Sequence, residues 1–187
     1  MRVTPSALPD VLVIEPQVMG DNRGFFLETF HVARYAEHGI RTPFVQDNHS
    51  RSVRNTVRGL HLQIARPQAK LIRVVSGAIF DVAVDVRVGS PTFGQWVGVH
   101  LSAENRRQCY IPEGFAHGFS VTSDGAEVEY KCTDYFEPSG QLGIAWNDPA
   151  LGITWGVSDA VLSDRDRTNP TLHDVRDRLP IYGFTKP

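Results

Sequence analysis

The sequence predicts an all-β fold, in which two sheets close into a jelly-roll barrel with a few short helices at its periphery. Runs rich in Val, Ile, Phe and Thr recur along the chain between Gly, Pro, Asn and Ser, which is typical of short strands joined by turns. Examples are VLVIEPQV, KLIRVVSG, AIFDVAVDVR and WVGVHLS. Many short strands must close into a barrel or pack as two sheets to protect their edges, so we predict a jelly roll.

Alternation is clearest in residues 79 to 86, where every even-numbered position is Phe or Val. The odd-numbered positions form the opposite face of a strand and are Ile79, Asp81, Ala83 and Asp85. An acid on an otherwise apolar inner face suggests a cavity with polar lining. Asp81 is therefore a candidate for either a site or a structural hydrogen bond.

Helical patterns are restricted to HVARYAEHG, residues 31 to 39, and to parts of the tail from Ser158 to Asp177. With 187 residues and 41% hydrophobic content, the chain is long enough to bury roughly two-thirds of its surface on folding. No linker or repeat interrupts it. We expect a single domain over residues 1–187.

Charge and composition argue against several classes of partner. The net charge is -2 with scattered basic residues, which gives no stripe for tracking phosphates, and no apolar run approaches the roughly 20 residues of a membrane helix. Cys109 and Cys132 lack the spacing of a zinc or redox motif. Since no signal-like leader is present, we expect a cytoplasmic protein that binds neither nucleic acid nor membrane.

The segment PEGFAH, from Pro112 to His117, matches the P-x-G-x-x-H turn of cupin jelly rolls, which brings a histidine to the inner face of the barrel. Metal-binding cupins add H-x-H and a glutamate from other strands, so that three histidines and a carboxylate hold the ion. Here the corresponding strand reads His61-Leu62-Gln63, followed by Lys70. Two histidines beside an ammonium predict a cupin without metal.

Seven segments in order resemble the dTDP-4-dehydrorhamnose 3,5-epimerase family over roughly residues 10 to 175. They are GDNRGFFLETF, FVQDNHSRS, VRGLHLQ, AKLIRV, GAIFDVAVDVRVGSPTFGQWVGVHLSAEN, IPEGFAHGF and YKCTDYFEPSGQLGIAWNDP. The resemblance implies a homodimer of jelly rolls, a dTDP-4-dehydro-6-deoxy-D-glucose substrate and no cofactor.

Epimerisation beside a ketone requires one group that removes a proton and another that returns a proton on the opposite face. Histidine suits the base, because its ordinary pKa of about 6.5 leaves it mostly neutral at pH 7, and His61 fits that role. Lys70 is our candidate donor to the enolate oxygen, and Tyr130, on an apolar strand face, can return the proton. The resemblance matches His61 with the base, Tyr130 with the acid and Asp166 with the carboxylate that orients the base.

The resemblance also implies a set of substrate-binding residues. Arginine suits a diphosphate, because its guanidinium forks match phosphate oxygens. Gln46 and Asn48 share one strand face, whereas Arg58 and His61 reach the same site only if the strand bulges at Gly59. Two positions depart from the family, which usually has a second tyrosine and a glutamate there; these are Phe136 and Gln141. The expected binding residues are Arg23, Glu28, Gln46, Asp47, Asn48, Arg58, Lys70, His117, Phe136, Gln141 and Arg165.

Three functions stay open on the sequence. The first is epimerisation at both C3 and C5, which feeds dTDP-L-rhamnose biosynthesis. The second is epimerisation at a single carbon in a deoxysugar pathway, which needs only a changed position of the ring. The third is a cupin that binds a sugar nucleotide without turnover. Without the resemblance, a histidine between Leu60 and Leu62 would more often be a structural residue.

Overall fold

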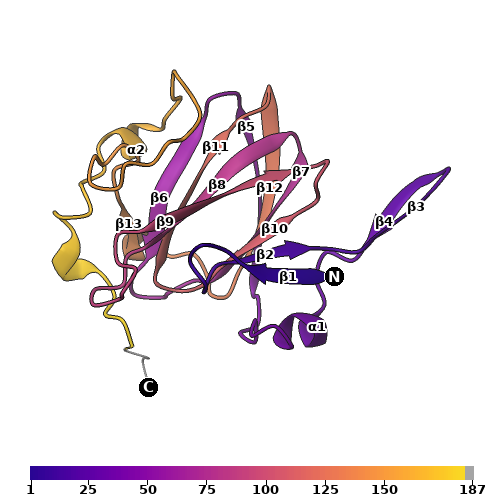
Figure 1. The fold of residues 1–187 in the computed structure, drawn as a ribbon. Helices are drawn as coiled ribbons and strands as arrows, with labels where there is room; N and C mark the ends of the chain where they lie inside the picture. The colour runs from indigo at the N-terminus through magenta and orange to yellow at the C-terminus, as the bar shows by residue number, and fades with distance from the viewer. Residues whose placement is uncertain (184–187) are drawn as a thin grey trace.

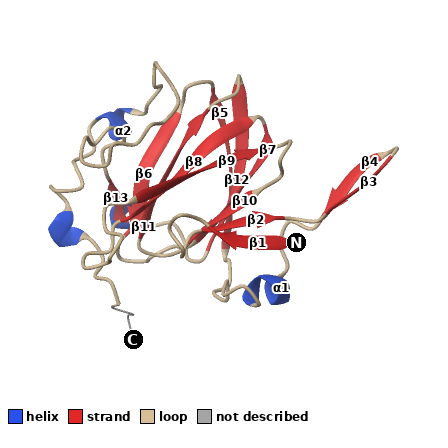
Figure 2. Cartoon of the chain, in the orientation of Figure 1, coloured by secondary structure: helices blue, strands red, loops and turns tan. Residues whose placement is uncertain are grey.

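The computed structural model describes residues 1–183 and has two β-sheets that face each other (Figure 1). Strands dominate, and the helices are short and peripheral (Figure 2), so the predicted all-β jelly roll is confirmed. None of the helices within residues 1–183 is long and apolar enough to cross a membrane.

The larger sheet has the strand order β1-β2-β10-β7-β12-β5. Its strands are β1 (Arg2–Pro5), β2 (Leu12–Glu15), β10 (Gln108–Ile111), β7 (Lys70–Ser76), β12 (Gly125–Cys132) and β5 (Gln46–Val53). The smaller sheet has the order β13-β6-β11-β8-β9. Its strands are β13 (Gln141–Gly143), β6 (Val57–Gln63), β11 (Phe115–Val121), β8 (Ala78–Asp85) and β9 (Trp96–Ser102).

The barrel interior is an apolar cluster to which both sheets contribute. The larger sheet supplies Ile72 and Val128, and the smaller sheet supplies Ile79, Ala83 and Phe119. Side chains of successive strand residues point to opposite faces, which explains why Ile79, Asp81 and Ala83 all face inward. The alternation predicted for residues 79 to 86 is therefore confirmed.

The outer face of the smaller sheet is buried as well. Val82 and Val84 on β8 pack against Leu151, Trp155 and Leu172 from the C-terminal third of the chain. This third, which carries η1 (Pro138–Gly140), α2 (Asp164–Arg167) and η2 (Arg176–Arg178), lies beside β6 and β13 in Figure 1. This packing brings residues of the C-terminal segment, which follow the barrel strands in the sequence, close to β6.

Two N-terminal elements lie outside the barrel. The helix α1 (Val32–Ala36) buries Tyr35, whose hydroxyl donates to Gln108 Oε1 at 2.8 Å, in agreement with the helix predicted for residues 31 to 39. The strands β3 (Val18–Asp21) and β4 (Gly24–Leu27) pair only with each other. Their hairpin projects away from the barrel (Figure 1).

A bulge in β6 interrupts its pairing with β11. His61 pairs with His117 and Arg58 pairs with Phe119, so two residues of β6, Gly59 and Leu60, lie opposite one residue of β11. Gly59 has a φ of 114°, and a Cβ there would lie 2.6 Å from the Cα of Gly118. Only glycine fits this position, and the predicted bulge is confirmed.

Candidate active site

A cavity of about 650 Å³ opens between the two sheets. The inward-facing residues of β5 and β12 form one wall, β6 and β11 form the other, and the C-terminal segment closes one side. Residues predicted from the sequence that line it are Gln46, Asn48, Arg58, His61, Lys70, His117, Tyr130, Phe136, Gln141, Arg165 and Asp166. These eleven side chains come from segments spread over 120 residues of sequence, and the barrel brings them together.

His61 and Asp166 form a hydrogen-bonded pair at the edge of this cavity. The Nε2 atom of His61 lies 2.6 Å from Oδ1 of Asp166, and their side chains are 24% and 5% exposed. Burial by itself raises the pKa of Asp166, but the hydrogen bond and charge of His61 outweigh it and hold this pKa below its ordinary value. Asp166 therefore remains a carboxylate that can orient the imidazole.

The helix α2 presents Asp166 to β6 through its first turn. Ser163 is the N-cap, and its hydroxyl accepts from the backbone N–H of Asp166 at 3.1 Å, which satisfies one of the free donors of a helix start. The backbone N–H of Gly59 lies 3.5 Å from Asp166 Oδ2. The bulge that turns Arg58 and His61 into the cavity therefore also contacts the carboxylate.

Tyr130 and Lys70 belong to the opposite wall, on the larger sheet. Burial raises the pKa of the Tyr130 phenol, so this group stays protonated at neutral pH. Burial lowers the pKa of Lys70, and the nearby Cys132 and Asp81 partly counter this effect. Both side chains can donate hydrogen bonds into the cavity.

A second histidine–carboxylate pair lies deeper in the barrel. His117 Nε2 is 2.7 Å from Asp81 Oδ1, with exposures of 10% and 0%. Burial lowers the pKa of His117 against the opposing pull of Asp81. Asp81 thus has a structural hydrogen bond to His117 and also acts on the site through its charge near Lys70.

The mouth of the cavity is held by polar contacts between its walls. Arg58 Nε donates to Ser52 Oγ at 2.9 Å, and Arg165 donates to the side-chain oxygen of Gln141. The backbone N–H of Phe136 donates to Gln46 Oε1 at 2.8 Å. Two guanidinium groups and an aromatic ring therefore surround the opening, as suits a nucleotide diphosphate.

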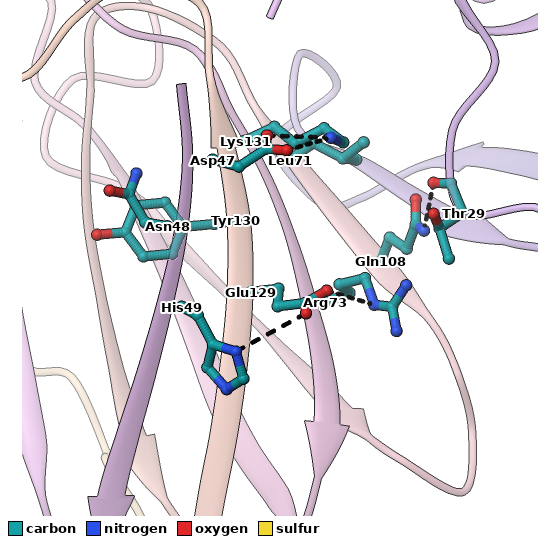
Figure 3. Close-up of a pocket in the computed structure, with 10 residues that line it drawn as sticks. All are labelled: Thr29, Asp47, Asn48, His49, Leu71, Arg73, Gln108, Glu129, Tyr130 and Lys131. Carbon is teal, nitrogen blue, oxygen red and sulfur yellow. Dashed lines mark hydrogen bonds and ion pairs between the residues drawn. The ribbon is translucent and has the colours of Figure 1, made fainter. Parts of the chain in front are cut away.

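Three of the expected binding residues do not line this cavity. Arg23 is on the projecting hairpin and pairs with Asp21 at 2.5 Å, and Glu28 pairs with Arg34 at 2.6 Å. Asp47 faces the outer side of the larger sheet, opposite to Asn48, and forms an ion pair with Lys131 at 3.0 Å (Figure 3). That outer side has a smaller pocket of about 230 Å³, whose wall includes Arg73 and Glu129.

Sequence reasoning missed several residues of the cavity. Ser50 and Ser52 line it from β5, and Cys132 lines it from β12. The signal was available, because Ser50 and Ser52 continue the alternation that begins with Gln46 and Asn48, as Cys132 continues that of Tyr130. Ser163 also lines the cavity, but only its N-cap role is visible in the local pattern.

A jelly roll whose interior holds a histidine–carboxylate pair facing a phenol and a lysine has the groups for acid–base chemistry, and the fold makes it a cupin-type enzyme. In the described residues 1–183 no three His, Cys, Asp or Glu side chains are grouped to hold a metal ion.

The chain belongs to the dTDP-4-dehydrorhamnose 3,5-epimerase family, whose model matches residues 5–174. It is 54% identical over 177 residues to the dTDP-4-dehydrorhamnose 3,5-epimerase of Pseudomonas aeruginosa, covering 94% of this chain and 98% of that protein. A dTDP-4-dehydrorhamnose 3-epimerase of Streptomyces niveus is 42% identical over 188 residues, covering 98% of this chain and 90% of that relative.

The fold is similar to a crystal structure of the dTDP-6-deoxy-D-glucose-3,5-epimerase of Legionella pneumophila in complex with dTDP-4-keto-L-rhamnose. The TM-score is 0.95 with 48% sequence identity, and the match covers 98% of this chain and 99% of that chain. The resemblance inferred from seven segments is thereby confirmed, and the chain is an isomerase by family.

Proposed function

We propose that this protein epimerises C3 and C5 of dTDP-4-dehydro-6-deoxy-D-glucose to give dTDP-4-dehydro-L-rhamnose, without a cofactor. The observation that carries the proposal is the position of the base and the acid on opposite walls of one cavity. His61 lies on β6 of the smaller sheet, and Tyr130 lies on β12 of the larger sheet. A sugar ring between them has one group at each face.

In the first step, His61 removes the proton from the carbon beside the ketone. Its Nε2 is engaged by Asp166, so Nδ1 carries the lone pair that accepts the proton. The electron pair of the C–H bond moves into the ketone, and the negative charge develops on the ketone oxygen. Asp166 stabilises the resulting imidazolium.

In the second step, the enolate collapses and Tyr130 delivers a proton to the other face of the carbon. Lys70 donates a hydrogen bond to the enolate oxygen, and such a preorganised donor contributes roughly 3 kcal/mol to catalysis. The raised pKa of Tyr130 supports this assignment, because the phenol must hold its proton until the enolate forms. Solvent then returns a proton to the phenolate and takes one from the imidazolium.

The test is proton exchange in heavy water. Incubation of dTDP-4-keto-6-deoxyglucose with the protein in D₂O should place deuterium at both C3 and C5, as read by NMR. The variant Tyr130→Phe should retain exchange while losing inversion. If wild-type protein binds the sugar nucleotide and neither carbon exchanges, the enzyme proposal fails and non-catalytic binding takes its place.

Label at only one carbon would indicate the second candidate, a single-carbon epimerase. The Streptomyces niveus relative, named a 3-epimerase, favours keeping this candidate, because the same base and acid serve both reactions. Identifying the epimers formed at each time point distinguishes the double epimerase from the single-carbon epimerase.

We further propose that the active form is a homodimer. The hairpin β3–β4 projects from the barrel and exposes Phe25 and Phe26 at 60% and 65%. β5 lies at one edge of the larger sheet, where no further strand of residues 1–183 pairs with it, so a second copy can cover this edge. Arg23 and Glu28, which lie outside their own cavity, would then be available to the cavity of a second copy.

Light scattering tests this assembly. A particle of about twice the 20.8 kDa chain mass is expected, and Phe26→Asp should shift it toward the monomer. A monomeric wild-type protein at working concentration contradicts the proposal.

Exhaustive chelation should leave activity unchanged. Loss of activity with a chelator and its recovery with zinc, iron or manganese would overturn the metal-free reaction.

We also propose a cytoplasmic location, where nucleotide sugars are used for biosynthesis.

A further inference from the structure

Asn169 contacts the carboxylate that orients the base. Its Nδ2 donates to Oδ1 of Asp166 at 3.3 Å, and this is the same oxygen that bonds to His61 Nε2. Asn169 does not line the cavity, so it has no access to a substrate there. Any effect of Asn169 on the reaction therefore passes through its protein neighbours, and of these Asp166 bonds directly to His61.

The amide of Asn169 lies in a notch left by Gly143. A Cβ at Gly143 would lie 2.1 Å from Asn169 Oδ1 and 2.4 Å from its Cγ, so the amide packs directly against the glycine backbone. Gly143 pairs with His61 across the β13–β6 ladder. Pro170, the residue after Asn169, is also held in place, because its carbonyl accepts a hydrogen bond from the backbone N–H of Ala145 at 2.7 Å.

We propose that Asn169 is a positioning residue for the base: its amide, seated in the Gly143 notch, holds Asp166 Oδ1 in line with Nε2 of His61. This inference rests on the proposed function in so far as His61 is the base. Gly143 and Asn169 depend on each other, because the Asn169 amide can occupy this position only where residue 143 has no side chain.

The hydrogen bond from Asn169 also shares the charge of Oδ1. Without it, Oδ1 carries more charge toward the imidazole, which favours the imidazolium in the free enzyme. The carboxylate also turns more freely, so it no longer holds the imidazole aligned for proton transfer. The variant Asn169→Ala should therefore lower kcat about tenfold, as expected for a lost hydrogen bond to a charged group. KM should stay unchanged, and the acid limb of the kcat/KM profile should move to higher pH.

Two further variants separate the hydrogen bond from packing. Asn169→Asp keeps the shape but faces Asp166 with a second carboxylate, so it should lower kcat more than Asn169→Ala does. Thr168→Val is the matched control, because within residues 1–183 the Thr168 hydroxyl bonds only to the carbonyls of Asp164 and Arg165. The other charged or titratable groups that line the cavity with His61 and Asp166 are kept in every variant; they are Arg51, Arg58, Lys70, His117, Tyr130, Cys132 and Arg165.

The notch is tested by a double-mutant cycle. Gly143→Ala alone should displace the amide and lower kcat as much as Asn169→Ala. In the double variant the closest clashes of the new methyl group are removed, because the three atoms nearest to it in the wild type all belong to Asn169. The double variant should therefore be no slower than Asn169→Ala, and additive losses would overturn the role of the notch.

A measurement without turnover keeps the inference separate from the proposed reaction. In ¹⁵N NMR spectra of the imidazole, wild-type His61 should show the single tautomer protonated at Nε2, and Asn169→Ala should show mixed tautomers. If the tautomers change in this way but the wild-type protein has no epimerase activity, the proposed function is refuted and the positioning role remains intact. An unchanged spectrum together with an unchanged acid limb would overturn the positioning role, even if kcat falls.

Discussion

The two histidine–carboxylate pairs of the cavity are neighbours, since His61 and His117 pair directly across β6 and β11. They differ in where the carboxylate comes from. Asp81 belongs to β8, the strand beside β11, and is fully buried. Asp166 belongs to a helix outside the barrel and reaches in from the C-terminal segment.

This difference supports the proposal that His61 is the base and His117 a binding group. Burial lowers the pKa of His117, so its imidazole resists a proton and suits hydrogen bonding to a sugar hydroxyl. His61 is more open, at 24% exposure, and its carboxylate keeps a pKa below the ordinary value. A histidine that must gain and lose protons needs both solvent access and a stable counter-charge, and only the outer pair has both.

The largest expected effect comes from removing each histidine in turn. His61→Asn should lower kcat on the order of 10⁴-fold, because general-base catalysis is lost, and should abolish deuterium exchange at both carbons. His117→Gln, whose amide nitrogen can replace Nε2, should retain exchange and mainly raise KM. Comparable loss of exchange in both variants would end the distinction between the pairs.

Replacing the carboxylates should show the same order with a smaller effect: kcat should fall more when Asp166 is replaced than when Asp81 is replaced. Asp166→Asn should lower kcat roughly 10³-fold, because an amide can hold the imidazole in the wrong tautomer. Asp81→Asn should keep the rate within about tenfold and instead lower stability by about 1–3 kcal/mol, since a buried hydrogen bond is altered. Initial rates and urea unfolding curves of both variants measure the two effects.

The smallest expected effect is a pH dependence of stability due to His117. Its pKa is lowered in the folded protein from 6.5, so below about pH 6.5 the unfolded chain takes up a proton that the folded protein resists. The contribution of neutral His117 to the free energy of unfolding is therefore complete above this pH and is lost as the pH falls. At pH 5.5 the loss is at most about 1.4 kcal/mol. Urea unfolding at pH 7.5 and 5.5 should show a larger decrease for wild type than for His117→Gln, and equal decreases would refute it.

Much of the barrel could be predicted from alternation alone. The inward direction of Asp81, of Gln46 with Asn48 and of Tyr130 follows from the two-residue period of a strand. The bulge at Gly59 followed from requiring Arg58 and His61 to face one site. The alternation is a local property that a single sequence contains, whereas the bulge also required the resemblance, which placed Arg58 and His61 at one site.

The pairing of Asp166 with His61 could not be found in this way. The two residues are 105 positions apart, and the segment LSDRD has only the local pattern of a helix N-cap at Ser163. The resemblance supplied Asp166 by analogy, together with Arg23 and Asp47. It could not state that Arg23 would lie on a projecting hairpin, because that depends on how the hairpin packs. Asp47 faces outward, as alternation with Gln46 and Asn48 requires.

The origin of Asp166 in the C-terminal segment also has a consequence in time. β12 is the strand of the larger sheet that comes latest in the sequence and ends at Cys132, and Asp166 follows 34 residues later. At a synthesis rate of roughly 5–20 residues per second, the ribosome makes β5, β6, β11 and β12, the strands of the two cavity walls, about 2 to 7 seconds before it makes the carboxylate. A chain that has grown only as far as these strands therefore carries His61 but not the carboxylate that hydrogen-bonds to it.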